Sequence, residues 1–192
     1  MNSVFNPETI KRENPDAIIL ATGSKPIIPN IPGAKQNNVF TCIELLLGEK
    51  VSGDKVVIIG GGLEGCETAL WLARKGKEVL IIEQLDSIIN DIHRSNRTML
   101  LDLLEENNVT INVNSKVIGI ESNDVIIKNK EGESKKVNGD TIVLAVGMES
   151  DNELYKMLLN EGFKELYNIG DSNSPSKIAN AVWEGHMLAL NL

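Results

Sequence analysis

The segment VVIIGGGLEGCETAL, residues 56–70, constrains the fold of this chain more than any other feature. An apolar run typical of a buried strand meets Gly60, Gly61 and Gly62, and a helical pattern follows. With Gly65 the spacing is G-x-G-x-x-G. In a strand-to-helix turn, these glycines permit unusual backbone angles, close approach to a pyrophosphate and close helix packing. The helix N-terminus would then present N–H groups to the phosphates.

A carboxylate stands where a dinucleotide site requires one. Glu83 ends the next apolar strand, 23 residues after Gly60, close to the spacing of about 20 expected for a ribose-binding acid. This carboxylate would repel a 2′-phosphate, so NAD(H) is favoured over NADP(H). Arg94 and Arg97 offer a 2′-phosphate contact as an alternative, but a solvated helix start explains them more simply. The predicted cofactor-binding residues around the turn are Gly60, Gly61, Gly62, Leu63, Glu64, Gly65, Glu67 and Glu83.

The segments after the turn complete an α/β pattern. A strand over 54–60, a helix over 63–76 and a strand over 77–84 form a βαβ unit of a parallel sheet. A helix over 96–108 follows, and four short alternating segments within 109–140 predict a small antiparallel meander. Only 4% of residues are aromatic, and an aliphatic-rich chain suits doubly covered parallel strands. The expected fold is therefore a Rossmann-like, three-layer dinucleotide-binding domain with a meander.

The most distinct boundary is the stretch 26–53. Pro26, Pro29 and Pro32 exclude a helix or a central strand there and indicate a linker. A short helix should follow Thr41, because Glu44 completes a capping box. We therefore divide the chain into residues 1–25, this linker and short helix, a nucleotide-binding domain over 54–148, and residues 149–192.

Charge and composition exclude several classes of function. A net charge of −8 without a basic stripe argues against nucleic acid and anionic membrane as partners. Cys42 and Cys66 lack a C-x-x-C spacing, so neither a zinc site nor a dithiol is predicted. His93 and His186 are isolated, so no metal site and no catalytic residue is assigned. The absence of an export signal or a long apolar stretch predicts a reducing cytoplasmic location.

Four segments together resemble the pyridine-nucleotide flavoprotein oxidoreductases. They are PDAIILATGSKPIIPNIPG, VVIIGGGLEGCETALWLARKGKEVLIIE, DTIVLAVGMESDNELY and LYNIGDSNSPSKIANAVWEGHMLA. More narrowly, they are similar to the C-terminal part of fused NADH:flavin oxidoreductases. That group, which includes 2-enoate reductase, 2,4-dienoyl-CoA reductase and trimethylamine dehydrogenase, joins this part to an old-yellow-enzyme-like barrel.

The resemblance implies roles for further residues. The segment ATG at 21–23 would cross from the FAD domain to the NAD domain, and AVG, ending at Gly147, would cross back. Asp171 in IGD would contact the ribityl chain or pyrophosphate of FAD. Glu67 would border the nicotinamide, although a carboxylate favoured by the helix dipole is an equal alternative. Glu64 would be either solvated or close to the phosphates.

The chain also departs from this family. No earlier G-x-G-x-x-G precedes Gly60, and neither the barrel nor clustered cysteines occur. We therefore expect a fragment in which remnants of an FAD domain, 1–25 and 149–192, flank an NAD-binding domain. FAD would be a cofactor of the full-length protein, and FMN and an iron–sulfur cluster would belong to the missing upstream part.

Three hypotheses about function follow. The chain is the NADH-binding module of a flavin-dependent reductase and inactive alone, a non-redox site for an adenine nucleotide such as ADP, or an inert interaction module. In the first, hydride passes from NADH to FAD without a side-chain acid, base or nucleophile. The expected partners are the dinucleotide and, within the same polypeptide, the missing barrel and FAD half. Whether the protein also forms a homo-oligomer is left open.

Overall fold

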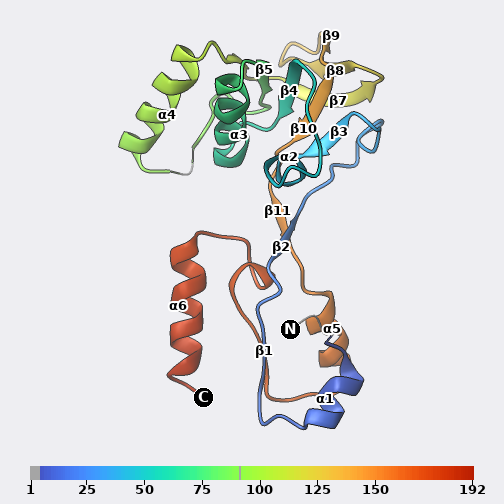
Figure 1. The fold of residues 1–192 in the computed structure, drawn as a ribbon, viewed down its shortest axis with the longest axis vertical. Helices are drawn as coiled ribbons and strands as arrows, with labels where there is room; N and C mark the ends of the chain where they lie inside the picture. The colour runs from blue at the N-terminus through green and yellow to red at the C-terminus, as the bar shows by residue number, and fades with distance from the viewer. Residues whose placement is uncertain (1–4, 91) are drawn as a thin grey trace. The chain divides into compact units, whose positions relative to one another are not determined.

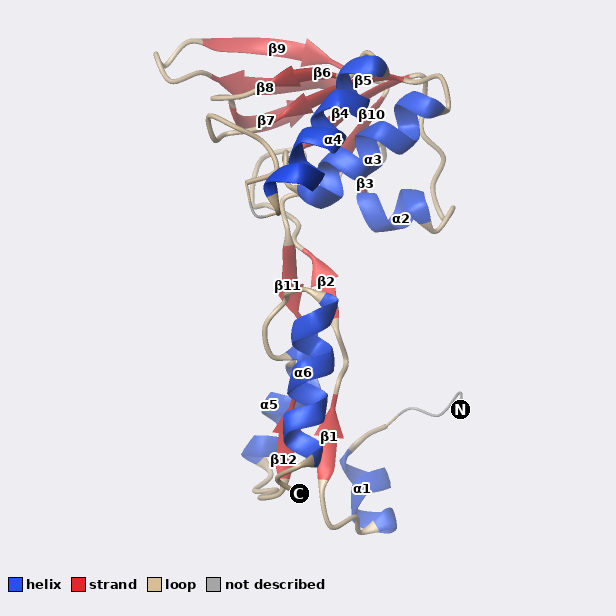
Figure 2. Ribbon diagram, turned by 90° about the vertical axis from the view of Figure 1, so that its left-hand side faces the viewer, coloured by secondary structure: helices blue, strands red, loops and turns tan. Residues whose placement is uncertain are grey.

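The computed structural model describes residues 5–90 and 92–192, which divide into two compact units (Figures 1 and 2). One unit contains the described residues up to Lys25 together with Met148–Leu192. The other is Pro26–Gly147, which we call the insert unit. Within the described residues, no helix combines the length and the apolar character needed to cross a membrane.

The insert unit is built on a five-stranded sheet in which every neighbouring pair is parallel. The strands, in spatial order, are β3 (Val39–Thr41), β10 (Thr141–Leu144), β4 (Lys55–Ile59), β5 (Glu78–Ile82) and β6 (Thr110–Asn112). The helices of this unit are α2 (Cys42–Leu46), α3 (Leu63–Arg74) and α4 (Arg94–Glu106). The predicted βαβ unit is confirmed, because α3 connects the adjacent parallel strands β4 and β5.

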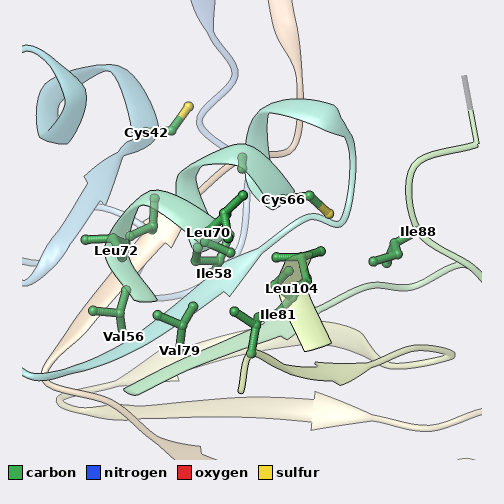
Figure 3. Packing of buried hydrophobic residues seen from close by; sticks show 14 of the residues in the cluster. Cys42, Val56, Ile58, Cys66, Leu70, Leu72, Val79, Ile81, Ile88 and Leu104 are labelled. Carbon is green, nitrogen blue, oxygen red and sulfur yellow. The ribbon is translucent and has the colours of Figure 1, made fainter. Parts of the chain in front are cut away.

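Both faces of the sheet are covered, which gives three layers. Val56 and Ile58 point into a core that includes Cys66 of α3 and Leu104 of α4 (Figure 3). The alternate residues of β4 pack instead against an antiparallel meander. Its strands are β7 (Lys116–Glu121), β8 (Asp124–Lys128) and β9 (Ser134–Asn138). The expected Rossmann-like, three-layer α/β fold with a meander is therefore confirmed.

Two strands differ from the sequence-based expectation. The sequence pattern predicts residues 109–114 as part of the meander, but β6 pairs with β5 and forms one edge of the parallel sheet. An edge strand has only one partner and is partly exposed, so it shows the same polar alternation as an antiparallel strand. At the opposite edge β3, within the stretch 26–53, pairs with β10.

The second unit is smaller and discontinuous in sequence. Its elements are α1 (Pro7–Glu13), β1 (Ile18–Leu20), β2 (Ser24–Pro26), β11 (Met148–Ser150), α5 (Glu153–Asn160), β12 (Leu166–Asn168), the 3-10 helix η1 (Gly170–Ser172) and α6 (Ile178–Ala189). β1 and β12 pair in parallel. Ile10, Leu158 and three strand residues form its buried cluster. None of the α6 residues, all within the described part of the chain, is buried.

Candidate functional site

The glycine turn lies between β4 and α3, where packing leaves no room for larger residues. Gly60 has φ 112°, and a Cβ placed there would lie 2.1 Å from the carbonyl oxygen of Ala145. A Cβ at Gly65 would lie 2.1 Å from the carbonyl oxygen of Gly60. Since real Cβ atoms do not approach backbone oxygens so closely, these two glycines are required by the fold itself. They bring α3 tightly against β4 and the end of β10.

Gly62 is different, because nothing lies within 4 Å of a Cβ built at this position. It is exposed, it has φ −69°, and it caps α3 without a side-chain hydrogen bond. Open space therefore lies at Gly62, beside the first turn of α3, and we call this space the cradle. Such a cradle at a helix N-terminus is suited to an anion, because the amides donate hydrogen bonds and the helix dipole favours negative charge.

Glu83 is nine-tenths buried beside this cradle, at the carboxyl end of β5. Its Oε2 accepts a hydrogen bond of 2.7 Å from the N–H of Gly61, and its Oε1 accepts one of 2.8 Å from the N–H of Leu85. A carboxylate has about four lone-pair sites. Two therefore remain for hydroxyl donors, so the side chain holds the turn and can still bind a ribose.

Cys66 lies beneath the turn, in the first part of α3. Its side chain is fully buried, and its thiol donates a hydrogen bond of 3.5 Å to the carbonyl oxygen of Gly61. Burial, together with the negative charges of Glu83 and Glu67, raises the pKa of the Cys66 thiol to about 12. The thiol therefore stays protonated and is no nucleophile at neutral pH.

The other residues predicted near the turn occupy the surface of α3. Leu63 is half-buried and packs against the helix-side core, whereas Glu64 and Glu67 are exposed. The structure brings them together with the four glycines and Glu83 at the carboxyl end of the parallel strands. This edge of an open α/β sheet is where ligands bind.

Arg97 has a contact that the sequence did not reveal. Its Nε donates hydrogen bonds to the carbonyl oxygens of Ile88 and Ile89, at 3.1 and 3.0 Å. Arg94, in contrast, is exposed at the start of α4. His93 caps this helix, since its Nδ1 accepts a hydrogen bond from the N–H of Ser95. No sequence signal points to the Arg97 contact, because it depends on the path of the loop after β5.

Gly147 and Asp171 lie in different units. Gly147 follows β10 with φ 112°, and its carbonyl oxygen accepts a hydrogen bond of 3.0 Å from the N–H of Ile27. Asp171 lies in η1, where its Oδ2 accepts a hydrogen bond from the Ser24 hydroxyl and its Oδ1 accepts one from the N–H of Ser176. Residues 5–90 and 92–192 contain no group of three or more His, Cys, Asp or Glu side chains that could hold a metal ion.

Comparison with known proteins gives consistent matches over almost the whole chain. A family model described as pyridine nucleotide-disulphide oxidoreductase matches residues 6–185. Cinnamate reductase of Clostridium sporogenes is 35% identical over 195 residues, which cover 100% of this chain and 29% of that protein. NADH oxidase of Thermoanaerobacter brockii is 39% identical over 188 residues, which cover 95% of this chain and 29% of that protein.

A solved structure agrees with these matches. A 2-naphthoyl-CoA reductase in complex with 2-naphthoyl-CoA superposes with a TM-score of 0.92 and 31% identity, over 100% of this chain and 29% of that one. The chain thus spans less than a third of the length of each of these relatives.

Proposed function

Because the chain belongs to the pyridine nucleotide-disulphide oxidoreductase family, we propose that it is the NADH-binding module of a larger flavin-dependent reductase. The resemblance seen in the sequence is confirmed at the level of the family and its fused flavoprotein members. The names of two relatives, cinnamate reductase and 2-naphthoyl-CoA reductase, favour an enoate or acyl-CoA reductase as the whole protein.

One observation carries the proposal: the open cradle at Gly62 lies beside the buried carboxylate of Glu83. The first-turn amides of α3 would hold the diphosphate, and the free lone pairs of Glu83 would accept hydrogen bonds from the adenosine ribose. Gly61, Leu63, Glu64 and Gly65 would complete the turn around the diphosphate, and Glu67 would border the nicotinamide.

This chain's own contribution would be binding and orientation. NADH, when bound, supplies a hydride that FAD accepts, and that chemistry belongs to the cofactors. Gly147 would keep the end of β10 close to the dinucleotide, and Asp171 would contact FAD. FMN and an iron–sulfur cluster would be held by parts of the protein outside this chain, in a cytoplasmic setting.

The preference for NADH over NADPH is also part of the proposal. A 2′-phosphate would meet the Glu83 carboxylate, and bringing two negative charges together in a nine-tenths buried position is unfavourable. Because Glu83 also holds Gly61, substituting it would disturb the turn as well as the selectivity. The preference is therefore best measured on the unaltered chain.

Calorimetric titration of this chain with NADH, NADPH and ADP tests the proposal. We expect saturable binding of NADH and weaker binding of NADPH. If NADPH binds more tightly than NADH, the selectivity argument is wrong. If neither NADH nor ADP binds, the functional assignment fails and only the family and fold remain.

A non-redox ADP site is the second candidate, and a specific observation favours it. The residues that best fit a ligand, the turn and Glu83, would recognise the ADP moiety that ADP and NADH share. Mixing the full-length protein with NADH under anaerobic conditions separates the two functions. Bleaching of the flavin absorbance would exclude the ADP-only site, whereas an unchanged flavin spectrum with tight ADP binding would favour it.

The exposed apolar surface of α6 supports a larger protein. Ile178 is 85% exposed, Val182 is 67% exposed and Trp183 is 64% exposed, whereas such side chains are normally covered when they lie together on one helix. We propose that the FAD half of the same polypeptide covers this helix. Dinucleotide and flavin would then meet only in the full-length protein.

A further inference from the structure

The loop after β5 contains a strained residue close to the glycine turn. Ile89 is fully buried and has φ 54°, a left-handed conformation that a β-branched residue avoids unless its surroundings impose it. The neighbouring Ile88 packs in the same core cluster as Cys66 and Leu104 (Figure 3). A Cβ at Gly61 would lie only 2.4 Å from the Cγ2 atom of Ile88.

Arg97 holds this pair of isoleucines from the first turn of α4. Its Nε donates to the carbonyl oxygens of Ile88 and Ile89, at 3.1 and 3.0 Å. Hydrogen bonds from a guanidinium are strengthened by its charge, and arginine keeps that charge at any pH the protein meets. The contact therefore favours the strained conformation of Ile89.

The strained loop in turn helps to fix one peptide plane of the glycine turn, whose carbonyl also accepts the longer hydrogen bond from the Cys66 thiol. The N–H of Ile89 donates a hydrogen bond of 2.9 Å to the carbonyl oxygen of Gly61. In a planar trans peptide, the carbonyl and the following N–H point in opposite directions. With the Gly61 carbonyl directed at Ile89, the N–H of Gly62 points away from that loop.

We propose that Arg97 is a positioning residue for the diphosphate site. It acts through Ile89, whose N–H orients the peptide between Gly61 and Gly62 so that the Gly62 N–H is directed at the ligand. This inference rests on the proposed function, because it assigns a task to Arg97 at the same site. It also replaces the alternative in which Arg97 contacts a 2′-phosphate directly.

The first arm of the experiment uses the unliganded chain. Exchange of the Ile89 amide hydrogen is measured by NMR in the unaltered chain, in Arg97→Gln and in Arg74→Gln, which removes the same charge from an exposed position at the far end of α3. We expect the Ile89 amide to exchange about tenfold faster in Arg97→Gln and unchanged in Arg74→Gln. Unchanged exchange in Arg97→Gln would overturn the inference.

Arg97→Lys guards against a general loss of folding. Lysine keeps the charge and can reach one carbonyl as a point donor, so exchange between that of the unaltered chain and that of Arg97→Gln is expected. If the Ile89 amide exchanges at the same rate in Arg97→Gln, Arg97→Lys and Arg74→Gln, the effect is not specific to Arg97 and the inference is wrong.

The second arm measures binding of NADH, ADP and adenosine. In Arg97→Gln we expect the dissociation constants of NADH and ADP to rise about five- to tenfold, whereas that of adenosine, which has no diphosphate, stays unchanged.

Loss of NADPH affinity with full retention of NADH affinity would instead identify a 2′-phosphate contact and overturn the inference. If the unaltered chain binds and Arg97→Gln binds equally well, only this inference fails. If the unaltered chain binds neither NADH nor ADP, the proposed function fails and this inference with it.

Discussion

At the scale of single residues, Glu83 joins a structural role to a proposed binding role. Both carboxylate oxygens accept backbone N–H groups, from Gly61 and from Leu85. Glutamine would keep one acceptor oxygen but place an NH2 group against the second N–H. A buried N–H left without its acceptor costs about 1–3 kcal/mol.

Glu83→Gln should therefore lower the free energy of unfolding by about 1–3 kcal/mol, measured by urea denaturation. Glu78→Gln is the matched control, since Glu78 lies on the same strand and pairs with Lys55 at the surface. Its effect should stay within about 0.5 kcal/mol, as for most exposed ion pairs. Equal denaturation midpoints for the two variants would show that Glu83 does not hold the turn.

Gly62 and Gly65 provide a test that separates binding from folding. Gly65→Ala places a Cβ 2.1 Å from the carbonyl oxygen of Gly60, so we expect a loss of about 1–3 kcal/mol in stability, as for other overpacked sites. Gly62→Ala meets only open space and should change stability by less than about 1 kcal/mol.

The same Gly62→Ala variant should nevertheless weaken NADH binding by about tenfold or more, because its methyl group enters the space assigned to the diphosphate. Calorimetric titration beside a urea denaturation curve gives both quantities. Undiminished NADH affinity would place the diphosphate elsewhere.

Cys66 should be unreactive in the folded chain. Burial raises the pKa of its thiol from 9.0 to about 12, so at pH 8 its thiolate population is lower by about a thousandfold than in the unfolded chain. In a Cys42→Ala background, labelling with a thiol reagent should be far slower than in guanidinium chloride. Similar rates in the two conditions would contradict the buried, protonated thiol.

The same shift predicts a dependence of stability on pH. The folded chain holds the Cys66 proton more tightly than the unfolded chain does, so this contribution is complete below pH 9.0 and is lost as the pH rises toward about 12. Cys66→Ala should lack this part of the decline in unfolding free energy.

Sequence alone predicts the candidate-site residues whose position depends on local spacing, and their role stays a prediction. The glycines and Glu83 follow from strand, turn and strand in order along the chain. Ile89 and Arg97 do not, since their task arises where a loop folds back on the turn, and neither residue type signals it. The double hydrogen bonding of Glu83 was also missed, because spacing specifies where a carboxylate lies but not which amides surround it.

At the scale of elements, prediction succeeded where a segment has a complete local signal. The capping box of α2 is confirmed, because the Thr41 hydroxyl accepts from the Glu44 N–H and the Glu44 carboxylate accepts from the Thr41 N–H. The sequence pattern misses β3 and places β6 in the meander. Both strands form edges of the sheet, and edge strands depend on distant partners. The N-terminal helix α1, capped by Asn6, also went unpredicted in a short polar segment.

The capping box gives a prediction for α2. Thr41→Ala removes the buried hydroxyl that caps α2 and should lower the free energy of unfolding by about 1 kcal/mol, within the range known for N-caps. Thr98→Ala, at an exposed position within α4, should change it by less than about 0.5 kcal/mol. If the two variants unfold at the same urea concentration, the capping box contributes nothing measurable.

At the scale of the whole molecule, the two units differ in how much core each contains. The insert unit has a buried cluster on each face of its sheet, whereas the other unit has a single small cluster around Ile10 and Leu158. Local opening requires less free energy where fewer apolar side chains are buried. The β1–β12 pair should therefore open more readily than the centre of the five-stranded sheet.

Hydrogen exchange followed by mass spectrometry checks this difference. Amides of β1 and β12 should exchange about tenfold or more faster than those of β4 and β5 in this chain. In the full-length protein, where we propose that the FAD half covers α6, the difference should shrink. Equal exchange of the two pairs of strands in this chain would contradict the expected hierarchy.

The hydrogen bond between Ile27 and Gly147 means that the two ends of the insert unit lie next to each other. A unit whose two ends adjoin can be inserted into a host domain, or removed from it, with little displacement of the host residues on either side. The proposed nucleotide-binding unit is therefore suited to transfer between proteins as a single piece, with the host sequence on both sides left intact.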